Sequence, residues 1–247
     1  MPRYKLTVEY NGTPFYGWQV QPDVITVQQR IEEAIELFCG EHRRINCAGR
    51  TDAGVHALGQ IIHVDLPQER DEHSIQQGIN FFLKSRHIGI RNVVKVADNF
   101  HARFHAKKRH YTYRMINRNS PLVTDYKRAW LVPEKVDLDA MREAASYLEG
   151  EHDFSSFRDK HCQATSPVRS IDSITIVKSD ELVEFHVSAP SFLHHQVRIM
   201  VGTLRAVVFL GTRGGASTIT QQLSKLLFTE KVARSKPGRI LQKFKEW

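Results

Sequence analysis

The amino-acid sequence predicts an α+β protein made of two halves, each with the element order β-α-β-β-α-β. Hydrophobic residues make up 41% and charged residues 25% of the 247 residues, a composition typical of a folded globular protein. Segments that alternate apolar and polar side chains, as half-buried strands do, are interspersed with segments of helical apolar spacing. The order of these segments in the N-terminal half recurs in the C-terminal half, which indicates an internal duplication.

The N-terminal half has clear signals for its first two elements. Residues 5–10 alternate apolar and polar side chains, which predicts a strand. Residues 27–38 have helical apolar spacing, with Thr26 as an N-cap and Gly40 as a stop. The other elements expected here are strands over residues 44–48, 60–64 and 88–96 and a helix over residues 74–83. This order is that of a ferredoxin-like unit.

The C-terminal half varies the same theme. Its expected elements are a strand over residues 109–117, a helix over 138–148, a strand pair over 171–178 and 182–189 with a turn at Ser179-Asp180, a long helix over about 194–210 closed by Gly211, a shorter helix over 219–228 and a short last strand over 240–244. We therefore expect one half over residues 1–105 and a second over residues 106–247. Together they would form one extended antiparallel sheet with helices and a central catalytic cleft.

Charge and composition limit the partners and the cofactors. Lys and Arg number 35 against 27 Asp and Glu, a net charge of +8 that favours a polyanion but leaves RNA, DNA and acidic proteins open. No apolar run reaches the roughly 20 residues of a membrane helix, and the N-terminus lacks the apolar core of a signal peptide, so we expect a cytoplasmic protein. There are 13 histidines, but no Cys-x-x-Cys, His-Glu-x-x-His or Gly-rich nucleotide motif. Neither a metal nor a cofactor is expected.

The segment Cys47–Ala57 is the most unusual stretch, because small residues surround one arginine and one aspartate. Asp52 could simply accept backbone hydrogen bonds in a tight turn. Alternatively, Arg50 would project to the same side as Asp52 in an extended stretch, and a guanidinium there would lower the pKa of the carboxyl group. An ionised carboxylate in a dry cleft is a competent base or nucleophile.

Residues 100–114 interleave cationic side chains with the aromatic residues Phe100, Phe104, Tyr111 and Tyr113. Cations contact phosphates while aromatic faces stack on unpaired bases, which is what single-stranded nucleic acid requires. A solvated basic edge with aromatic residues in the core would give the same pattern. In a strand, Tyr111 and Tyr113 would share one face with Met115, while His110, Thr112 and Arg114 would share the other.

Arg198 lies among apolar residues near the start of the expected long helix. We expect it to be buried, and a buried arginine must be paired because an isolated buried charge costs several kcal/mol. An ordinary structural ion pair would satisfy this requirement. The more specific hypothesis makes Asp52 the partner of Arg198.

Several collinear motifs give the sequence a resemblance to the TruA family of tRNA pseudouridine synthases. Residues 48–56, Ala-Gly-Arg-Thr-Asp-Ala-Gly-Val-His, resemble that family's catalytic loop almost letter for letter. Further matching motifs lie at residues 16–19, 100–104, 111–113, 152–157 and 192–195. The resemblance departs from the family at Gln196 and Ile199, where Met and Asn are usual, and at residues 238–241, Gly-Arg-Ile-Leu.

The resemblance implies isomerisation of uridine to pseudouridine in the anticodon stem-loop of tRNA, at tRNA positions 38–40, without a cofactor. Asp52 would be the essential carboxylate, attacking the sugar or the base or removing a ribose proton. Tyr111 would stack on the target uracil, and Arg198 would pair with Asp52. Arg50 would fill the space left by the extruded base, and Leu241 would complete the uracil pocket.

The resemblance also implies a homodimer in which the tRNA contacts both subunits. The residues expected to contact RNA are Arg70, Phe100, His101, Ala102, Arg103, Phe104, Lys107, Lys108, Arg109, His161, Cys162, Gln163, Ala164 and Thr165. Two other hypotheses remain: a non-catalytic RNA-binding module that has inherited the loop, and a synthase acting on another RNA. The intact set of Asp52, Arg50 and Tyr111 argues against the first, and the lack of an appended RNA-binding domain argues mildly against the second.

Overall fold

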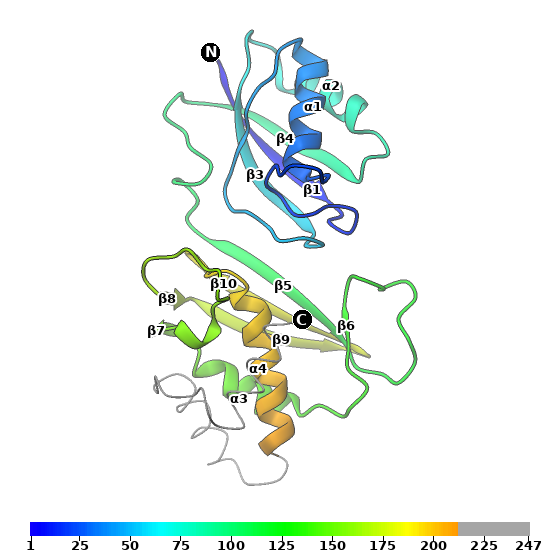
Figure 1. Ribbon diagram of the computed structural model, residues 1–247, viewed down its shortest axis with the longest axis vertical. Coiled ribbons are helices and arrows are strands. Elements are labelled where there is room, and N and C mark those ends of the chain that lie inside the picture. The colour runs from blue at the N-terminus through cyan, green and yellow to red at the C-terminus, as the bar shows by residue number, and fades with distance from the viewer. Residues whose placement is uncertain (212–247) are drawn as a thin grey trace. The chain divides into compact units, whose positions relative to one another are not determined.

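The protein, described by a computed structural model over residues 1–211, is of mixed α+β architecture (Figure 1). The chain divides into two compact units, residues 1–106 and residues 107–247. Each unit has its own hydrophobic core. The helix expected over residues 219–228, the strand expected over 240–244 and Leu241 lie outside the described residues.

The first unit contains the elements in the expected order. They are β1 (Arg3–Tyr10), α1 (Val27–Cys39), β2 (Asn46–Cys47), β3 (Ala57–Asp65), α2 (Glu72–Leu83) and β4 (Ile88–Val96). The strands form an antiparallel sheet in the order β2-β3-β1-β4, and α1 packs against α2. The predicted strand over residues 44–48 is reduced to the two residues of β2, but every element expected in this half is present.

Capping explains where the helices of this unit begin and end. Thr26 caps α1, because its side chain accepts a hydrogen bond from the backbone N–H of Gln29, as expected. Gly40 ends α1 in a left-handed conformation (φ 80°), which glycine adopts without steric cost. Helix α2 begins two residues before the predicted start, because Asp71 caps it by accepting from the N–H of Ser74 at 2.8 Å.

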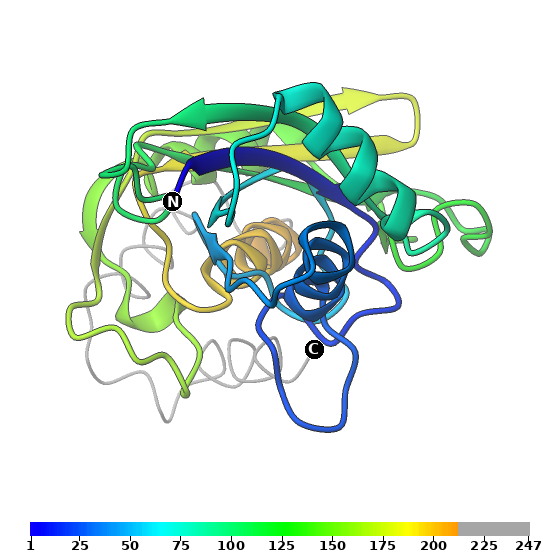
Figure 2. The ribbon, with the colours of Figure 1, turned by 90° about the horizontal axis from the view of Figure 1, so that it is seen from above.

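The second unit has more strands than the sequence indicated. Its elements are β5 (Arg109–Ile116), β6 (Trp130–Leu131), α3 (Leu138–Ser146), β7 (Gly150–Asp153), the short 3-10 helix η1 (Ser155–Phe157), β8 (Val168–Ile171), β9 (Ser173–Ser179), β10 (Leu182–Ala189) and α4 (Gln196–Gly211). The main sheet has the order β6-β5-β10-β9, and β7 pairs with β8 in a separate ribbon. Figure 2, which looks nearly along α4, shows this helix on one face of the sheet.

Three expectations for the second unit need correction. The sheet is not purely antiparallel, because β6 pairs parallel to β5. The strand expected over residues 171–178 is interrupted at Asp172, whose N–H instead bonds to the carbonyl of Ser188. The long helix begins at Gln196 rather than at residue 194, because His195 has a left-handed backbone conformation (φ 60°) that cannot continue a right-handed helix.

Within residues 1–211, no helix combines the length and the apolar character that crossing a bilayer would require. This finding concerns the described part of the chain alone.

The cap of α1 can be tested by substitution. Because Thr26→Ala removes the side-chain oxygen that accepts the N–H of Gln29, we expect the free energy of unfolding to fall by about 1 kcal/mol. Urea denaturation followed by far-UV circular dichroism would measure it. Thr13→Ala, at an exposed loop threonine, is the control and should change the free energy by less than about 0.5 kcal/mol. Equal effects of the two substitutions would contradict the capping role.

Candidate active-site residues in the two units

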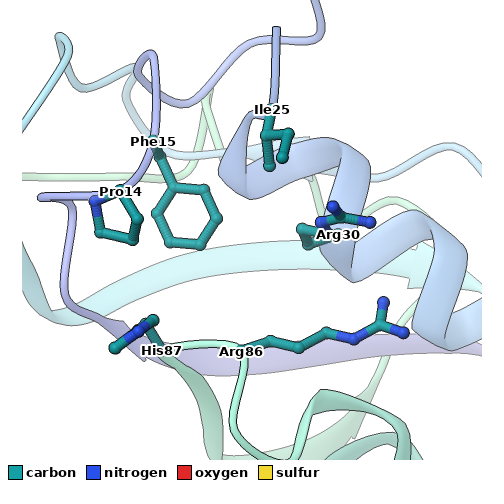
Figure 3. Close-up of a pocket in the computed structure, with 6 residues that line it drawn as sticks. All are labelled: Pro14, Phe15, Ile25, Arg30, Arg86 and His87. Carbon is teal, nitrogen blue, oxygen red and sulfur yellow. The ribbon is translucent and has the colours of Figure 1, made fainter.

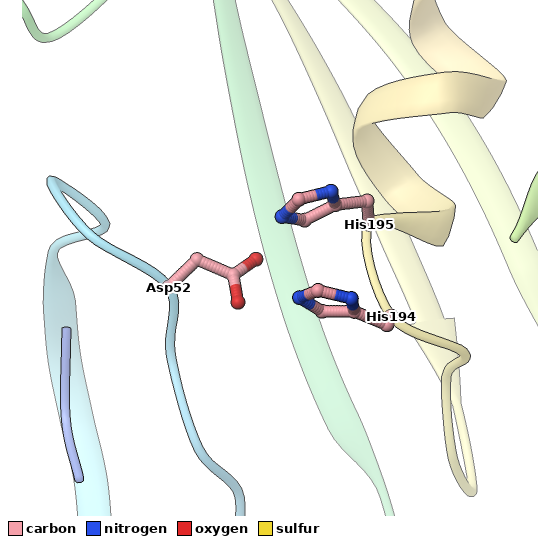
Figure 4. A group of neighbouring side chains, drawn as sticks. All are labelled: Asp52, His194 and His195. Atoms are coloured by element: carbon pink, nitrogen blue, oxygen red, sulfur yellow. The ribbon is translucent and has the colours of Figure 1, made fainter. Parts of the chain in front are cut away.

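The first candidate site is the loop between β2 and β3, residues 48–56, called here the aspartate loop. It carries Arg50, which is exposed, and Asp52, which is half-buried. Figure 4 shows Asp52 on this loop, which is itself neither helix nor strand. The backbone of a loop has no regular hydrogen-bond partners of its own, so it must bond to other segments of the chain. Those segments therefore determine the position of the Asp52 carboxylate.

The segment of residues 11–18 holds the aspartate loop by backbone hydrogen bonds in both directions. The N–H of Trp18 donates to the carbonyl of Thr51 at 3.0 Å, and the N–H of Gly54 donates to the carbonyl of Phe15 at 3.3 Å. These two bonds flank Asp52 on either side. Phe15 and Trp18 are themselves buried in the core of the first unit, so the loop is tied to the core through them.

Two glycines allow this close approach. A Cβ atom on Gly12 would lie 2.0 Å from the carbonyl oxygen of Val55, a distance that no real contact tolerates. A Cβ atom on Gly17 would lie 3.0 Å from the carbonyl oxygen of Thr51, and Gly17 also has a φ of +90°. The segment of residues 16–19, which matched a family motif, therefore supports the aspartate loop.

Arg50 affects a neighbouring thiol. Burial raises the pKa of Cys47 to about 11, although the positive charges of Arg50 and Arg103 act in the opposite direction. Cys47 is therefore a protonated thiol at neutral pH and does not serve as a thiolate nucleophile.

The second candidate region is the segment of residues 100–105, whose backbone is held by hydrogen bonds to side chains of β1 and β3. The backbone N–H of Ala102 donates to Nδ1 of His63 at 3.1 Å, and Arg3 donates to the carbonyl of Phe100 at 2.8 Å. Both Ala102 and His63 are buried. The sequence analysis missed His63, although its position among the apolar residues of β3 was a usable signal for a buried histidine.

The same segment directs other side chains to the solvent. Phe104 is 75% exposed, the guanidinium of Arg103 lies 5.9 Å from its ring centroid, and the ring of His101 lies 4.3 Å from it. An exposed phenylalanine beside a cation is suited to stacking on a nucleic-acid base. The basic and aromatic pattern is therefore partly a core anchor and partly an accessible surface.

His63 can anchor the segment because it stays neutral. Burial lowers the pKa of His63 to about 4, and the positive charge of Arg3 adds to the effect. The neutral imidazole accepts a hydrogen bond at Nδ1, which a protonated imidazole could not do.

The third candidate residue, Tyr111, lies on β5 in the second unit. Its ring meets the ring of Phe192 edge to face, with centroids 5.1 Å apart and an interplanar angle of 88°. Tyr113 points to the same face and packs against Trp130, and Met115 is fully buried there. The period-two prediction for this strand is confirmed at His110 and Thr112, which are exposed, whereas Arg114 on the same face is half-buried.

Arg198 lies on α4 close to the same strand. It is half-buried, whereas the sequence analysis expected a buried arginine. Burial raises the pKa of Tyr113, and the positive charge of Arg198 partly opposes this shift. Helix α4, which carries Arg198, packs against β5. Pairing of Arg198 with Asp52 stays a prediction.

The other residues predicted to contact RNA lie on surfaces of both units. Lys107 is exposed, Lys108 pairs with Asp172 at 3.0 Å, and Arg109 donates to the carbonyl of Pro190 at 2.5 Å. The guanidinium of Arg70 lies over the ring of Phe38 at 5.3 Å. Residues 161–165 form part of the loop between η1 and β8.

A buried carboxylate in this last loop was missed by the sequence analysis. Asp159 is 8% exposed, and its side chain bonds to His195, the last residue of the motif at residues 192–195. The rings of His194 and His195 stack with centroids 3.9 Å apart (Figure 4). A single aspartate in a polar stretch carries no sequence signal for burial, because its partners come from a distant segment.

A surface pocket of about 300 Å³ lies in the first unit beside the segment that holds the aspartate loop. Its lining combines apolar with basic side chains: Pro14, Phe15, Ile25, Arg30, Arg86 and His87 (Figure 3). Both guanidinium groups pair with Glu33, at 2.7 Å and 3.3 Å. Since these charges are already engaged within the fold, the pocket does not define a ligand site.

Comparison with known proteins gives consistent findings. A model of the tRNA pseudouridine synthase family matches residues 6–105 and 144–241. A protein of Ehrlichia canis named tRNA pseudouridine synthase A is 52% identical over 203 residues, covering 82% of this chain and 83% of the relative. A protein of Brucella ovis with the same name is 51% identical over 209 residues, covering 84% and 83% respectively.

The contact between Gly12 and the aspartate loop gives a stability prediction. Gly12→Ala places a methyl group against the carbonyl of Val55, so we expect a loss of about 1–3 kcal/mol in the free energy of unfolding. Gly49→Ala, in the aspartate loop itself, is the matched control because nothing lies within 4 Å of its Cβ position. Urea denaturation of both variants would measure their free energies of unfolding. A Gly12→Ala variant as stable as Gly49→Ala would refute the close contact between Gly12 and the aspartate loop.

The neutral state of His63 gives a pH prediction. The folded-state pKa of about 4 lies below the ordinary value of 6.5, so the folded state binds fewer protons than the unfolded state between these values. The contribution of His63 to stability is therefore complete above pH 6.5 and decreases as the pH falls toward 4. The difference in unfolding free energy between the wild type and His63→Gln should shrink over this range. His73→Gln, at an exposed histidine, should show no such trend.

Proposed function

Because this chain belongs to the tRNA pseudouridine synthase family, we propose that it isomerises uridine to pseudouridine in the anticodon stem-loop of tRNA, at tRNA positions 38–40. By family it is an isomerase. The observation that carries the proposal is the aspartate loop, whose residues on both sides of Asp52 are held by backbone hydrogen bonds. A carboxylate held in this way is pre-organised to act on a reacting group.

The reaction is balanced within one nucleoside. The bond between N1 of uracil and C1′ of ribose breaks, the base turns, C5 bonds to C1′, and the proton from C5 is lost while N1 gains one. No atom is added overall, so no co-reactant is needed. Asp52 would act as a nucleophile on the sugar or the base, or as the base that removes a ribose proton.

Tyr111 would provide the stacking surface for the flipped uracil. Its ring packs against the ring of Phe192 in a T-shaped arrangement, which limits its rotation. Arg198, near the same strand, would pair with Asp52, and Arg50 would fill the space that the extruded base leaves. Leu241 would close the apolar side of the uracil pocket.

Extruding a base from a stem costs a few kcal/mol, which RNA contacts must offset. The exposed Phe104 with its neighbour Arg103 can stack on a base, and the basic residues 107–109 can contact phosphates. Phosphate contacts position an RNA without reading its sequence, which suits recognition of a tRNA arm by shape. The segments 100–104 and 161–165 and Arg70 would complete this surface.

We also propose the architecture that the resemblance implies: ferredoxin-like halves over residues 1–105 and 106–247, joined in one extended sheet around a catalytic cleft. The strand order β2-β3-β1-β4 with two helices packed together supports it for the first half. The enzyme would act in the cytoplasm as a homodimer that binds tRNA across both subunits.

The two other hypotheses make different predictions. A non-catalytic module would bind tRNA without producing pseudouridine, and a synthase for another RNA would leave tRNA unmodified. The names of the relatives favour tRNA as the substrate, and the intact Asp52 favours catalysis.

Asp52→Asn tests the proposed function directly. It keeps the side-chain volume but removes the negative charge, so release of tritium from tRNA labelled with [5-³H]uridine should fall by more than the roughly 10²–10⁴-fold typical of a lost general base. Binding of tRNA, measured by filter retention, should persist. Asp23→Asn, at an exposed loop aspartate of the same unit, is the control and should retain activity. Sustained turnover by Asp52→Asn would overturn the proposal.

A further inference from the structure

Asp159 stands out among the acidic residues of the second unit because its carboxylate is almost fully buried. It lies in the loop of residues 158–167 between η1 and β8, and its side chain is 9% exposed. Placing a carboxylate there costs free energy unless hydrogen bonds and opposite charges compensate. The contacts of the carboxylate should therefore show which parts of the structure it holds together.

The contacts of Asp159 link two segments that are distant in the sequence. Its Oδ1 accepts the N–H of His161 at 2.7 Å, and its Oδ2 lies 3.2 Å from Nδ1 of His195. Nδ1 of His194 lies 3.7 Å from Oδ1. In addition, the backbone N–H of Asp159 donates to the carbonyl of His194 at 3.1 Å, and the N–H of Cys162 donates to the carbonyl of Asp159 at 3.0 Å.

The carboxylate is held in its charged form by these neighbours. Burial would raise the pKa of Asp159, but the N–H of His161 and the two imidazoles of His195 and His194 outweigh burial, and the net effect lowers it. The imidazoles of His194 and His195 stack on each other (Figure 4). Asp159 thus bonds to the backbone of its own loop and to the side chains of the other segment.

The turn that Asp159 holds determines where α4 begins. His195 has a φ of 60°, a conformation that a non-glycine residue keeps only when its surroundings stabilise it. The carbonyl of His195 accepts the N–H of Ile199 in the first turn of the helix. Arg198 lies in that turn, and Phe192, three residues before His195, touches the ring of Tyr111.

We propose that Asp159 is a positioning residue for the isomerisation: by fixing the turn of residues 192–195, it sets the orientation of Arg198 and of the Tyr111 ring. The inference rests on the proposed function, because it assigns Asp159 a role in that same reaction. Asp159 does not touch the substrate in this account. It acts through His195 and His194.

A comparison within the unit separates this role from an ordinary turn contact. Asp153 also accepts a backbone N–H two residues ahead, from Ser155 at 2.8 Å, but Asp153 is exposed. The local hydrogen bond therefore does not require burial. What distinguishes Asp159 is the second set of contacts, to the histidines at the start of α4.

The test uses Asp159→Asn in the full-length enzyme. The asparagine can still accept the N–H of His161, but it loses the charge that attracts the imidazoles. We expect the single-turnover rate on tRNA to fall about 10- to 100-fold, since small displacements of catalytic groups cost this much. The dissociation constant for tRNA should change by less than about threefold, because many phosphate contacts determine it.

Asp153→Asn is the matched control and should keep the wild-type rate. A folded Asp159→Asn variant with the wild-type rate would overturn the inference. Loss of tRNA binding in proportion to the rate would also overturn it, because it would indicate a role in RNA affinity instead.

A double-mutant cycle with His195→Gln tests whether Asp159 acts through His195. If it does, the double variant should be little slower than the slower single variant, whereas independent effects would multiply. Multiplied effects contradict the inference. If Asp159→Asn does not fold, His195→Gln alone still tests the inference. An unchanged single-turnover rate in that variant would exclude an action of Asp159 through His195.

Wild-type turnover measured in parallel separates the two claims. An inactive wild type would contradict the proposed function, whereas an active wild type with a fully active Asp159→Asn would contradict the positioning role alone.

Discussion

The position of Asp52 depends on backbone hydrogen bonds between two loops, and much of the first unit is arranged to make them possible. The segment of residues 11–18 donates to and accepts from the aspartate loop on both sides of Asp52. Gly12 leaves room for this approach, because any side chain there would collide with the loop. A loop lacks the regular backbone hydrogen bonds of a strand. The bonds to residues 11–18 hold the aspartate loop in place instead. The carboxylate thereby gains a fixed position while staying outside the core.

In each of the two units, a buried polar side chain holds a surface segment in place. His63 stays neutral and accepts the N–H of Ala102, which anchors a segment whose Phe104 and Arg103 face the solvent. Asp159 stays charged and anchors a turn that leads into α4. In both cases a side chain buried at a desolvation cost holds a surface segment, and satisfied hydrogen bonds make that cost tolerable. The expected RNA-binding surface thus rests on residues that do not belong to it.

The sequence predicted those structural features that depend on residues close together in the chain. The cap at Thr26 and the stop at Gly40 depend on adjacent residues, and both were predictable. The aspartate loop was recognisable as a motif, but its supports at Gly12 and Gly17 were not, because they depend on packing against a distant segment. Strand β6 pairs over only two residues with β5, and Asp159 is buried by residues more than thirty positions away. Contacts of this kind leave no periodicity in the sequence.

The residue at position 196 shows how strongly the turn before α4 is constrained. Gln196 is buried, and its Oε1 accepts the N–H of Leu193 at 2.8 Å. Within the described part of the chain, its Nε2 is buried without a hydrogen-bond partner, which costs about 1–3 kcal/mol. Gln196 therefore bonds to the backbone of the turn from the helix side, while Asp159 bonds to it from the loop side. Two polar side chains from distant segments therefore hold one short turn, which fixes the start of α4 from both sides.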